Sequence, residues 1–213
     1  RSNGVMFVPY ISTITNAFFN VINYNYTTGT FANVSLAIPT PPVFLSATTV
    51  VGTVWNGVDW SPQLGLFAAV GSATPYQAYS SDGNNWTAAA TVVGTNWTAI
   101  SWSPQLGLFV TVGGATPYQA YSSDGKNWTA ATTSLAGPWT ATTWSPQLSL
   151  FVAVASSSPY QAYSSDGKNW TTATTQTIPG WYSVAWSPQL GLFMAGGSTY
   201  FTTTSSSDGK NWV

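Results

Sequence analysis

One phrase of eight residues recurs along this 213-residue chain and constrains its architecture more than any other feature. The phrase W-S-P-Q-L-G-L-F begins at Trp60, Trp102, Trp144 and Trp186, with Ser149 replacing the glycine in the third copy. A second phrase, S-S-D-G-x-N-W, begins at Ser80, Ser122, Ser164 and Ser206 and keeps the same spacing of 42 residues. Self-similarity at a fixed period is typical of repeat architectures, so the chain is predicted to be an array of one small unit.

Each unit divides into four segments with the character of β-strands. In the copy that begins at Trp97, residues 97–102 and 118–122 alternate, residues 106–112 are continuously apolar, and residues 128–133 are rich in threonine. These patterns predict strands, and the Ser-Pro-Gln and Asp-Gly-Lys-Asn segments between them predict turns. Four antiparallel strands in about 40 residues, repeated, predict an all-β fold, namely a β-propeller of four-stranded blades.

The repeat also predicts the number of blades. Extending the register backward makes residues 12–53 a degenerate first blade, with strands near residues 18–24 and 31–38 on either side of a Thr-Thr-Gly turn at 27–29. Blades at 54–95, 96–137, 138–179 and 180–213 follow it. Residues 1–11 then occupy the position of a last strand, which the fifth blade lacks. We therefore predict one five-bladed domain, residues 1–213, whose ring is closed by the N-terminal strand within residues 5–11. The alternative makes residues 28–31 a decayed copy of the second phrase, which shifts the first blade and leaves closure unexplained.

The second phrase resembles the Asp-box, or BNR-type, repeat of sialidase-like propellers. The family pattern is S-x-D-x-G-x-x-W, whereas Asp and Gly are adjacent here, so the turn is one residue shorter. Units that pair both phrases also look like propeller repeats of phage and large-virus tail or surface proteins. The resemblance covers residues 54–213 and implies that the box aspartates fasten hairpin turns while the tryptophan packs beneath. Carried over, this gives a structural role to Asp82, Asp124, Asp166 and Asp208.

The charge inventory excludes several classes of function. The chain has four Lys and Arg residues, five Asp and Glu residues, and no His or Cys. Three lysines locked to the repeat and a terminal Arg1 make no basic stripe, so nucleic acid is not an expected partner. No apolar run is long enough to cross a bilayer, so no membrane insertion is expected. A surface of neutral Ser, Thr, Asn and Gln favours an extracellular, cell-surface or virion location.

The same inventory predicts a protein that is not an enzyme. Once the four box aspartates are set aside, Asp59 is the remaining carboxylate, whereas a glycosidase needs a pair. Without His or Cys there is no usual general base and no nitrogen or thiolate metal site, so neither metal nor cofactor is expected. The residues equivalent to Asp59 are Ser101, Thr143 and Ala185, and a hydrogen bond within its own opening strand is the favoured interpretation over a ligand contact.

The class of function that remains is the recognition of a ligand by neutral side chains. Loops between blades, and loops between second and third strands, emerge on one face of a propeller. Aromatic rings beside Asn and Thr suit a sugar, which needs an apolar stacking face and neutral hydrogen-bonding partners. The candidate ligand-binding residues on these loops are Trp55, Trp97, Trp139, Trp181, Tyr76, Tyr118, Tyr160 and Asn96. Packing between blades is favoured for the tryptophans, whereas the two roles are equally balanced for the tyrosines.

Six Asn-x-Ser/Thr sequons are candidate glycosylation sites, at Asn25, Asn33, Asn85, Asn96, Asn127 and Asn169. The leading hypothesis is a non-catalytic extracellular or virion-surface propeller that binds a glycan or another neutral cell-surface receptor. A structural subunit of a filament, capsid or tail, which would self-assemble, is the alternative. A degenerate sialidase-like hydrolase is the third hypothesis.

Overall fold

The computed structural model describes residues 51–52, 54–174, 180–197 and 202–213 with their side chains, and the backbone of residues 6–7, 19–25 and 30–36. The chain divides into two compact units, Arg1–Leu45 and Ser46–Val213, which are treated separately below. Every helix or strand in the described ranges is a β-strand, so no helix there is long and apolar enough to cross a membrane.

The N-terminal unit contains one antiparallel sheet in the order β1-β2-β3. Its strands are Met6–Phe7, Phe19–Asn25 and Thr30–Leu36. The strands β2 and β3 pair along their whole length, from Phe19 opposite Leu36 to Asn25 opposite Thr30. These are the two strands expected on either side of a Thr-Thr-Gly turn, although each is displaced by a residue or two from its predicted bounds.

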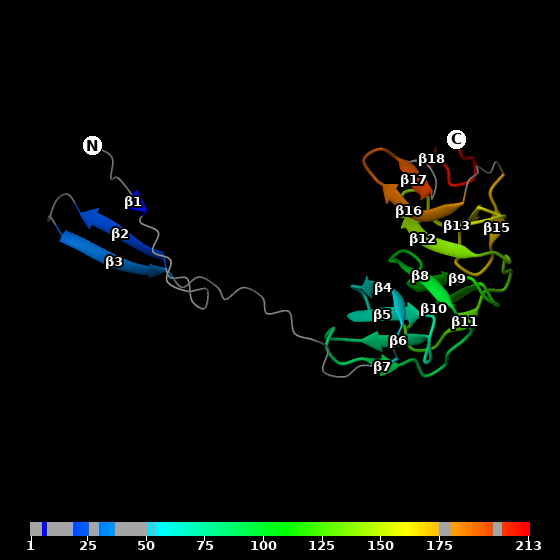
Figure 1. Cartoon of the computed structure of the whole chain (residues 1–213), viewed down its shortest axis with the longest axis horizontal. Coiled ribbons are helices and arrows are strands. Elements are labelled where there is room, and N and C mark those ends of the chain that lie inside the picture. The colour runs from blue at the N-terminus through cyan, green and yellow to red at the C-terminus, as the bar shows by residue number, and fades with distance from the viewer. Residues whose placement is uncertain are drawn as a thin grey trace. The chain divides into compact units, whose positions relative to one another are not determined.

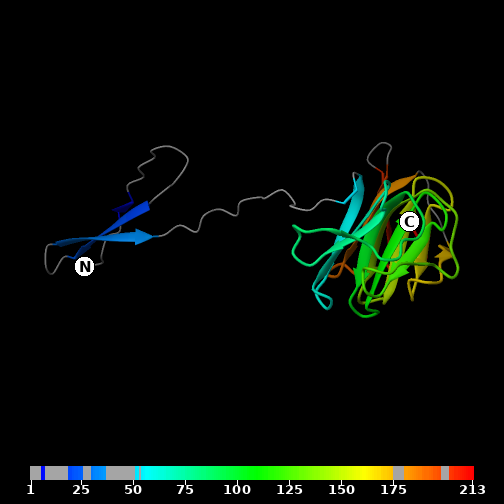
Figure 2. The same ribbon diagram turned by 90° about the horizontal axis from the view of Figure 1, so that it is seen from below.

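The second unit is a series of antiparallel sheets that follow one another in chain order (Figures 1 and 2). Three sheets have four strands: β4-β5-β6-β7, β8-β9-β10-β11 and β12-β13-β14-β15; within the described residues the last sheet, β16-β17-β18, has three. The first strands are Trp55–Ser61, Trp97–Ser103, Trp139–Ser145 and Trp181–Ser187, and the second strands are Leu66–Gly71, Leu108–Gly113, Leu150–Ala155 and Leu192–Gly197. The third strands are Gln77–Ser80, Gln119–Ser122, Gln161–Ser164 and Thr203–Ser206, and the fourth are Thr87–Ala88, Thr129–Ala130 and Thr171–Thr172.

The predicted strand pattern is confirmed, with shorter strands at two places. The apolar run 106–112 begins pairing only at Leu108, because Leu106 and Gly107 belong to the preceding turn, where Gly107 has φ of +63°. The threonine-rich run 128–133 pairs only over β11 and then leaves its own sheet. Its Thr133 instead forms a parallel bridge with Asn169 of the following repeat.

Each sheet has two distinct faces, which explains why β9 is mostly apolar and wholly buried. We call the face toward the following sheet the forward face and the face toward the preceding sheet the rear face. On the forward face, Ala68 and Val70 contact Trp97 and Trp128 from the rear face of the next sheet. Because both faces of an internal sheet are covered, every residue of β9 and β13 is buried. The first strands β4, β8, β12 and β16 adjoin one another in succession.

The glycine of the second, third and fourth S-S-D-G-x-N-W phrases is required by this packing. Gly125 has φ of +70°, a region that favours glycine. A Cβ atom there would lie 2.6 Å from Leu66 of the preceding sheet, and one at Gly167 would lie 2.7 Å from Val110. Adjacent sheets therefore approach too closely at this point for any side chain.

The structure does not confirm the predicted closure by residues 5–11. Met6 and Phe7 pair with Ile22 and Val21 of β2, and thus belong to the first sheet of the chain rather than to β16-β17-β18. The C-terminal residue Val213 exchanges backbone hydrogen bonds with Ser205 of β18, where the missing fourth strand would begin. The sequence register assigned residues 1–11 from their position alone, whereas a short antiparallel connection to β2 is available locally.

The packing of the tryptophan that opens each first strand predicts a large effect of its removal. Trp139 is fully buried, whereas Trp60 is 38% exposed. We expect Trp139→Ala to lower the free energy of unfolding by about 3–5 kcal/mol, because it leaves a large cavity between two sheets. Urea unfolding followed by circular dichroism measures this change. The matched variant Trp60→Ala should lose clearly less, and equal losses would contradict the proposed packing.

Candidate binding surfaces

The four S-S-D-G-x-N-W turns share one hydrogen-bond network. In the second copy, Asp124 Oδ1 accepts from the backbone N–H groups of Lys126 and Asn127 at 2.8 and 2.7 Å, and Oδ2 accepts from Asn127 Nδ2 at 2.8 Å. Ser122 Oγ donates to Asp124 Oδ1 and accepts from the N–H of Gly125. Asp82, Asp166 and Asp208 make the same contacts in their turns. The carboxylates therefore fasten hairpins, as the resemblance to Asp-box repeats implied.

This network lowers the pKa of all four carboxyl groups. For Asp82 the main cause is the backbone N–H of Asn85, followed by the Asn85 side chain. Burial acts to raise the pKa of Asp124, Asp166 and Asp208, but the amide and hydroxyl donors together outweigh it, and Asp208 falls to about 2. These groups are ionised and fully engaged at neutral pH, which leaves them unsuited to donate or accept a proton in catalysis.

Asp59 also serves the fold, through the predicted hydrogen bond within its own strand and through a second bond that was not predicted. Its Oδ1 accepts from the N–H of Trp60 at 2.8 Å, and its Oδ2 accepts from the N–H of Trp102 at 2.6 Å. The first bond lies within the opening strand, as predicted. The second, which was not predicted, links the forward face of that strand to the following sheet. All five carboxylates of the chain thus accept hydrogen bonds from backbone N–H groups.

A glutamine in each W-S-P-Q turn links it to the next repeat, a role that sequence reasoning missed. Gln63, Gln105 and Gln147 accept from the indole Nε1 of the next repeat's tryptophan at 2.8–3.0 Å. The indole rings of these tryptophans pack on a phenylalanine of their own second strand, with centroids about 4.6 Å apart. The only signal was the invariance of Gln across the four copies.

The three lysines are also used between repeats. Lys126, Lys168 and Lys210 lie over the rings of Tyr79, Tyr121 and Tyr163 in the preceding sheet, with Nζ 5.2–5.3 Å from the ring centroid. In the first described turn the position of the lysine is held by Asn84.

The structure places three of the four candidate tryptophans in the core. Trp97, Trp139 and Trp181 are buried between sheets, and the indole N–H groups of Trp97 and Trp139 donate to the linker carbonyls of Val93 and Leu135. A fully covered indole has no face on which a sugar could stack. Their proposed ligand role is therefore corrected to the packing role that the sequence analysis favoured.

The candidate tyrosines and Asn96 lie on a surface that we call the loop rim. It comprises residues 72–76, 114–118 and 156–160, between second and third strands, and linker residues 93–96 and 135–138. The N–H of Gly114 donates to the carbonyl of Asn96, which confirms that the two kinds of loop meet. Tyr76, Tyr118 and Tyr160 are half-buried there, and Asn96 is exposed. The rim contains no charged residue.

The backbone of the rim tyrosines is unusual. Tyr76, Tyr118 and Tyr160 have φ of 66°, 65° and 53°, in the left-handed region that costs a residue with a side chain about 1 kcal/mol or more. Each is followed by a buried glutamine. The side chain of Gln77 donates a hydrogen bond to the carbonyl of Val93 in the linker and accepts one from the N–H of the same residue. This glutamine, also missed from sequence, holds the two loops together and positions the tyrosine between them.

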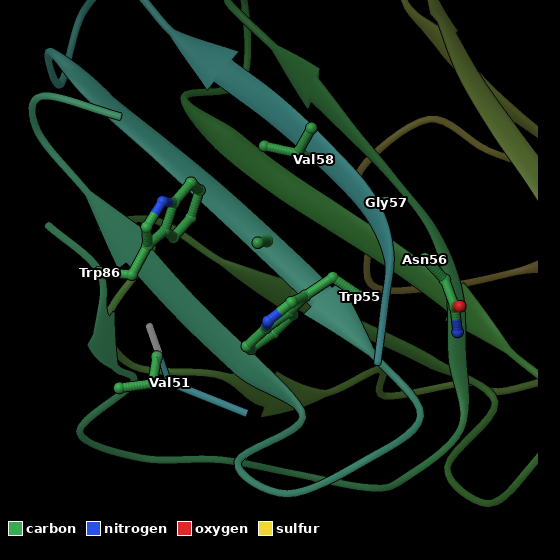
Figure 3. Close-up of a pocket in the computed structure, with 7 residues that line it drawn as sticks. Val51, Trp55, Asn56, Gly57, Val58 and Trp86 are labelled. Atoms are coloured by element: carbon green, nitrogen blue, oxygen red, sulfur yellow. The ribbon is translucent and has the colours of Figure 1, made fainter. Parts of the chain in front are cut away.

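The remaining tryptophan candidate, Trp55, lines a pocket of about 600 Å³ on the rear face of the first sheet of the second unit. The other lining residues are Val51, Asn56, Gly57, Val58, Ala69 and Trp86. Figure 3 shows Trp55 and Trp86 on this face, whereas the side chain of Asn56 points away from them. In the next two repeats the equivalents of Trp86, Trp128 and Trp170, are buried against the preceding sheet. The pocket is thus the uncovered counterpart of an interface between sheets.

The sequons in the repeats have side chains with structural roles. The Nδ2 atoms of Asn85, Asn127 and Asn169 donate to the aspartates of their own turns, and the Oδ1 atoms of Asn127 and Asn169 accept from Thr91 and Thr133. Asn25 and Asn33 lie in β2 and β3. Glycosylation at all six positions remains a prediction. Among the described residues, no group of three His, Cys, Asp or Glu side chains could hold a metal ion.

No model of a known protein family matches the chain, and no curated protein matches it. Solved structures match its fold. A GH74 enzyme from Niastella koreensis is 17% identical with a TM-score of 0.60, over 99% of this chain and 30% of that chain. A protein from Lactobacillus plantarum is 12% identical with a TM-score of 0.60, over 98% of this chain and 64% of that chain. A nidogen/laminin complex is 9% identical with a TM-score of 0.58, over 97% of this chain and 74% of that chain.

These identities show the fold alone. The repeated four-stranded antiparallel sheets therefore resemble those of propeller-type structures. The chain spans less than two thirds of the length of the GH74 enzyme and of the Lactobacillus plantarum protein. The activity of a structural neighbour at such low identity says nothing about the activity of this chain.

The lowered pKa of the turn aspartates predicts a stability that depends on pH. A carboxyl group whose pKa is lower when folded stabilises the protein above the unfolded pKa of about 4, and this stabilisation is lost as pH falls through the folded value. For Asp208 the folded value is about 2. We therefore expect the free energy of unfolding to fall between about pH 5 and pH 2, and Asp208→Asn to flatten that fall. Urea titrations across this range measure it.

The control is Ser207→Ala, which changes the exposed neighbour of Asp208 and should keep the wild-type pH dependence. Parallel curves for Asp208→Asn and the wild type would show that the network does not act through the ionised carboxylate.

Proposed function

We propose that this chain is a non-catalytic, extracellular or virion-surface propeller that binds a neutral receptor, most simply a glycan, at the loop rim. The observation that carries the proposal is the repeated tyrosine of the rim. Three copies hold a half-buried aromatic ring in a left-handed backbone at the same place in the repeat. A strained position that recurs is a reason to look for a function there.

The surroundings of the tyrosines suit a neutral ligand. Thr74, Thr116 and Ser158 are exposed beside them, and Asn96 is exposed on the adjoining linker. A sugar needs an aromatic surface together with neutral donors and acceptors. Each site would bind weakly, and several sites on one rim would gain affinity for a surface that carries many copies of the glycan.

Catalysis is not part of the proposal. Both oxygens of Asp59 accept from backbone N–H groups, and the four turn carboxylates are fastened in their hairpins. The acid and base steps of glycoside hydrolysis need a carboxyl group that is free to exchange a proton. The degenerate hydrolase is therefore the least supported of the three hypotheses.

A structural or assembling subunit is the second candidate function, and a separate observation favours it. The first and last sheets of the second unit each leave one apolar face uncovered among the described residues, with Val58 57% and Met194 46% exposed. A ring of five blades in one chain, with residues 12–53 as the first blade, also remains a prediction. It would cover these faces within one molecule, so the oligomeric state separates the two arrangements.

The rim proposal predicts the effect of removing its tyrosines. We expect the triple variant Tyr76→Ala, Tyr118→Ala and Tyr160→Ala to lose binding to a multivalent glycan surface, and Tyr118→Ala alone to weaken it by about tenfold or more because one of several sites is lost. A glycan array identifies the sugar, and surface plasmon resonance on that sugar measures the loss.

The control is Leu106→Ala, an exposed apolar residue in the turn at the opposite end of β9, which should bind as the wild type does. Tyr118→Phe keeps the ring and its packing, and separates a stacking contact from a hydroxyl contact. A folded wild-type protein that binds no glycan on the array, or a triple variant that binds unchanged, would contradict the rim as the site.

A further inference from the structure

The two ends of the sheet series carry the two halves of an interface that the chain already makes three times. Within the second unit, the structure describes no sheet before β4-β7 and none after β16-β18. No described sheet of this unit therefore covers the rear face of the first sheet or the forward face of the last sheet. Both kinds of face are covered in every internal sheet.

Equivalent residues show how much is exposed at the forward face of the last sheet. Ala68, Val110 and Val152 are fully buried beneath the following sheet, whereas Met194 at the same position is 46% exposed. Tyr182 is 57% exposed, although its equivalents Thr98 and Thr140 donate to the carbonyl of the next repeat's tryptophan. An apolar methionine and tyrosine together form an exposed patch.

The rear face of the first sheet is its complement. Ile100 is 8% exposed beneath the preceding sheet, whereas Val58 at the same position is 57% exposed. Trp60, Trp55 and Trp86 are likewise less covered than their equivalents, and the last two line the pocket in Figure 3. In the following repeat, the equivalent space is filled by the small forward-face residues of the preceding sheet.

The residues at the two ends also match one another. Gln189 stands where Gln63, Gln105 and Gln147 accept from a following tryptophan, and Trp60 stands where such a tryptophan lies. At the position of the cation–π pair, Ser205 stands in place of the tyrosine and Asn84 in place of the lysine. A junction between the two ends would therefore leave no lysine and no tyrosine of this pair without its partner. Met194, larger than its equivalents, would face Gly83, beside which a Cβ meets only Phe67 at 3.7 Å.

We propose that the forward face of the last sheet docks on the rear face of the first sheet of a second copy of this chain. The junction repeats the internal packing between sheets, and neither face carries a charge that would oppose it. It is a head-to-tail contact between different surfaces, which closes into a ring of chains or continues as a filament, depending on the rotation between copies. The inference rests on the assembling role, not on glycan binding at the loop rim.

The experiment uses two variants that each disable one face. Val58→Asp places a charge on the rear face of the first sheet, and Met194→Asp places one on the forward face of the last sheet. Both side chains are exposed, so both variants should fold. We expect the wild type to form concentration-dependent oligomers in sedimentation velocity, each variant alone to be monomeric, and their mixture to form a heterodimer, because one intact junction remains.

The control is Leu190→Asp, in the 72% exposed position of the last W-S-P-Q turn, which should assemble as the wild type does. A wild type that stays monomeric up to millimolar concentration would overturn the proposal and favour end faces covered within one chain. Variants that still self-associate, or a mixture that forms no heterodimer, would overturn it as well. Glycan binding by a monomeric wild type would leave the rim proposal intact.

A second measurement does not depend on loss of assembly. The chain has no cysteine, so Ser205→Cys in one sample and Asn84→Cys in another introduce single thiols at the position of the Tyr–Lys pair. A short bis-maleimide should join the two variants into a dimer far faster than either variant to itself. Equal rates for the mixed and the single samples would contradict head-to-tail docking.

Discussion

The packing of one sheet's small forward-face residues against the next sheet's tryptophans is the constraint on which the rest of the second unit depends. Ala68 and Val70 leave room for Trp97 and Trp128, and the turn glycines Gly125, Gly167 and Gly209 let the sheets approach. A single sheet of this length could not bury such aromatic surface by itself. The unit of stability is therefore the junction between repeats rather than the repeat, as in other repeat proteins.

Polar and charged side chains make hydrogen bonds and cation–π contacts at the same junctions, which explains why the chain has so few charged residues. The asparagine and threonine side chains of neighbouring turns, the lysine–tyrosine pairs and the glutamine–indole bonds each join adjacent repeats. The aspartates do local work within turns, except for Asp59, which reaches the next sheet. Since almost every ionisable group has such a partner, the surfaces left for recognition are neutral.

The sequence predicted those parts of the structure that depend on local pattern. The strands, their order within a sheet, the Asp-Gly turns and the packing of Trp97, Trp139 and Trp181 all follow from alternation, turn chemistry and size. The contacts of Gln63, Asp59 and Lys126 could not be predicted from local pattern, because each joins residues some 40 positions apart whose approach is decided by the packing of sheets. The pairing of Met6 and Phe7 with β2 was not predicted for the same reason, since repeat register does not specify which neighbouring strand a short segment will join.

Because the junctions between repeats are alike, the number of repeats in such a chain can change without altering the contacts between them. A unit that begins at Trp97 meets its two neighbours through contacts that the unit beginning at Trp139 repeats, down to the hydroxyl bond from Thr98 or Thr140 to the next tryptophan carbonyl. Duplicating or deleting an internal copy would therefore preserve the junctions on either side of the change. Val58 on the first sheet and Met194 on the last expose the positions that a neighbouring repeat covers elsewhere, so a change in the number of middle copies would leave both of these faces as they are.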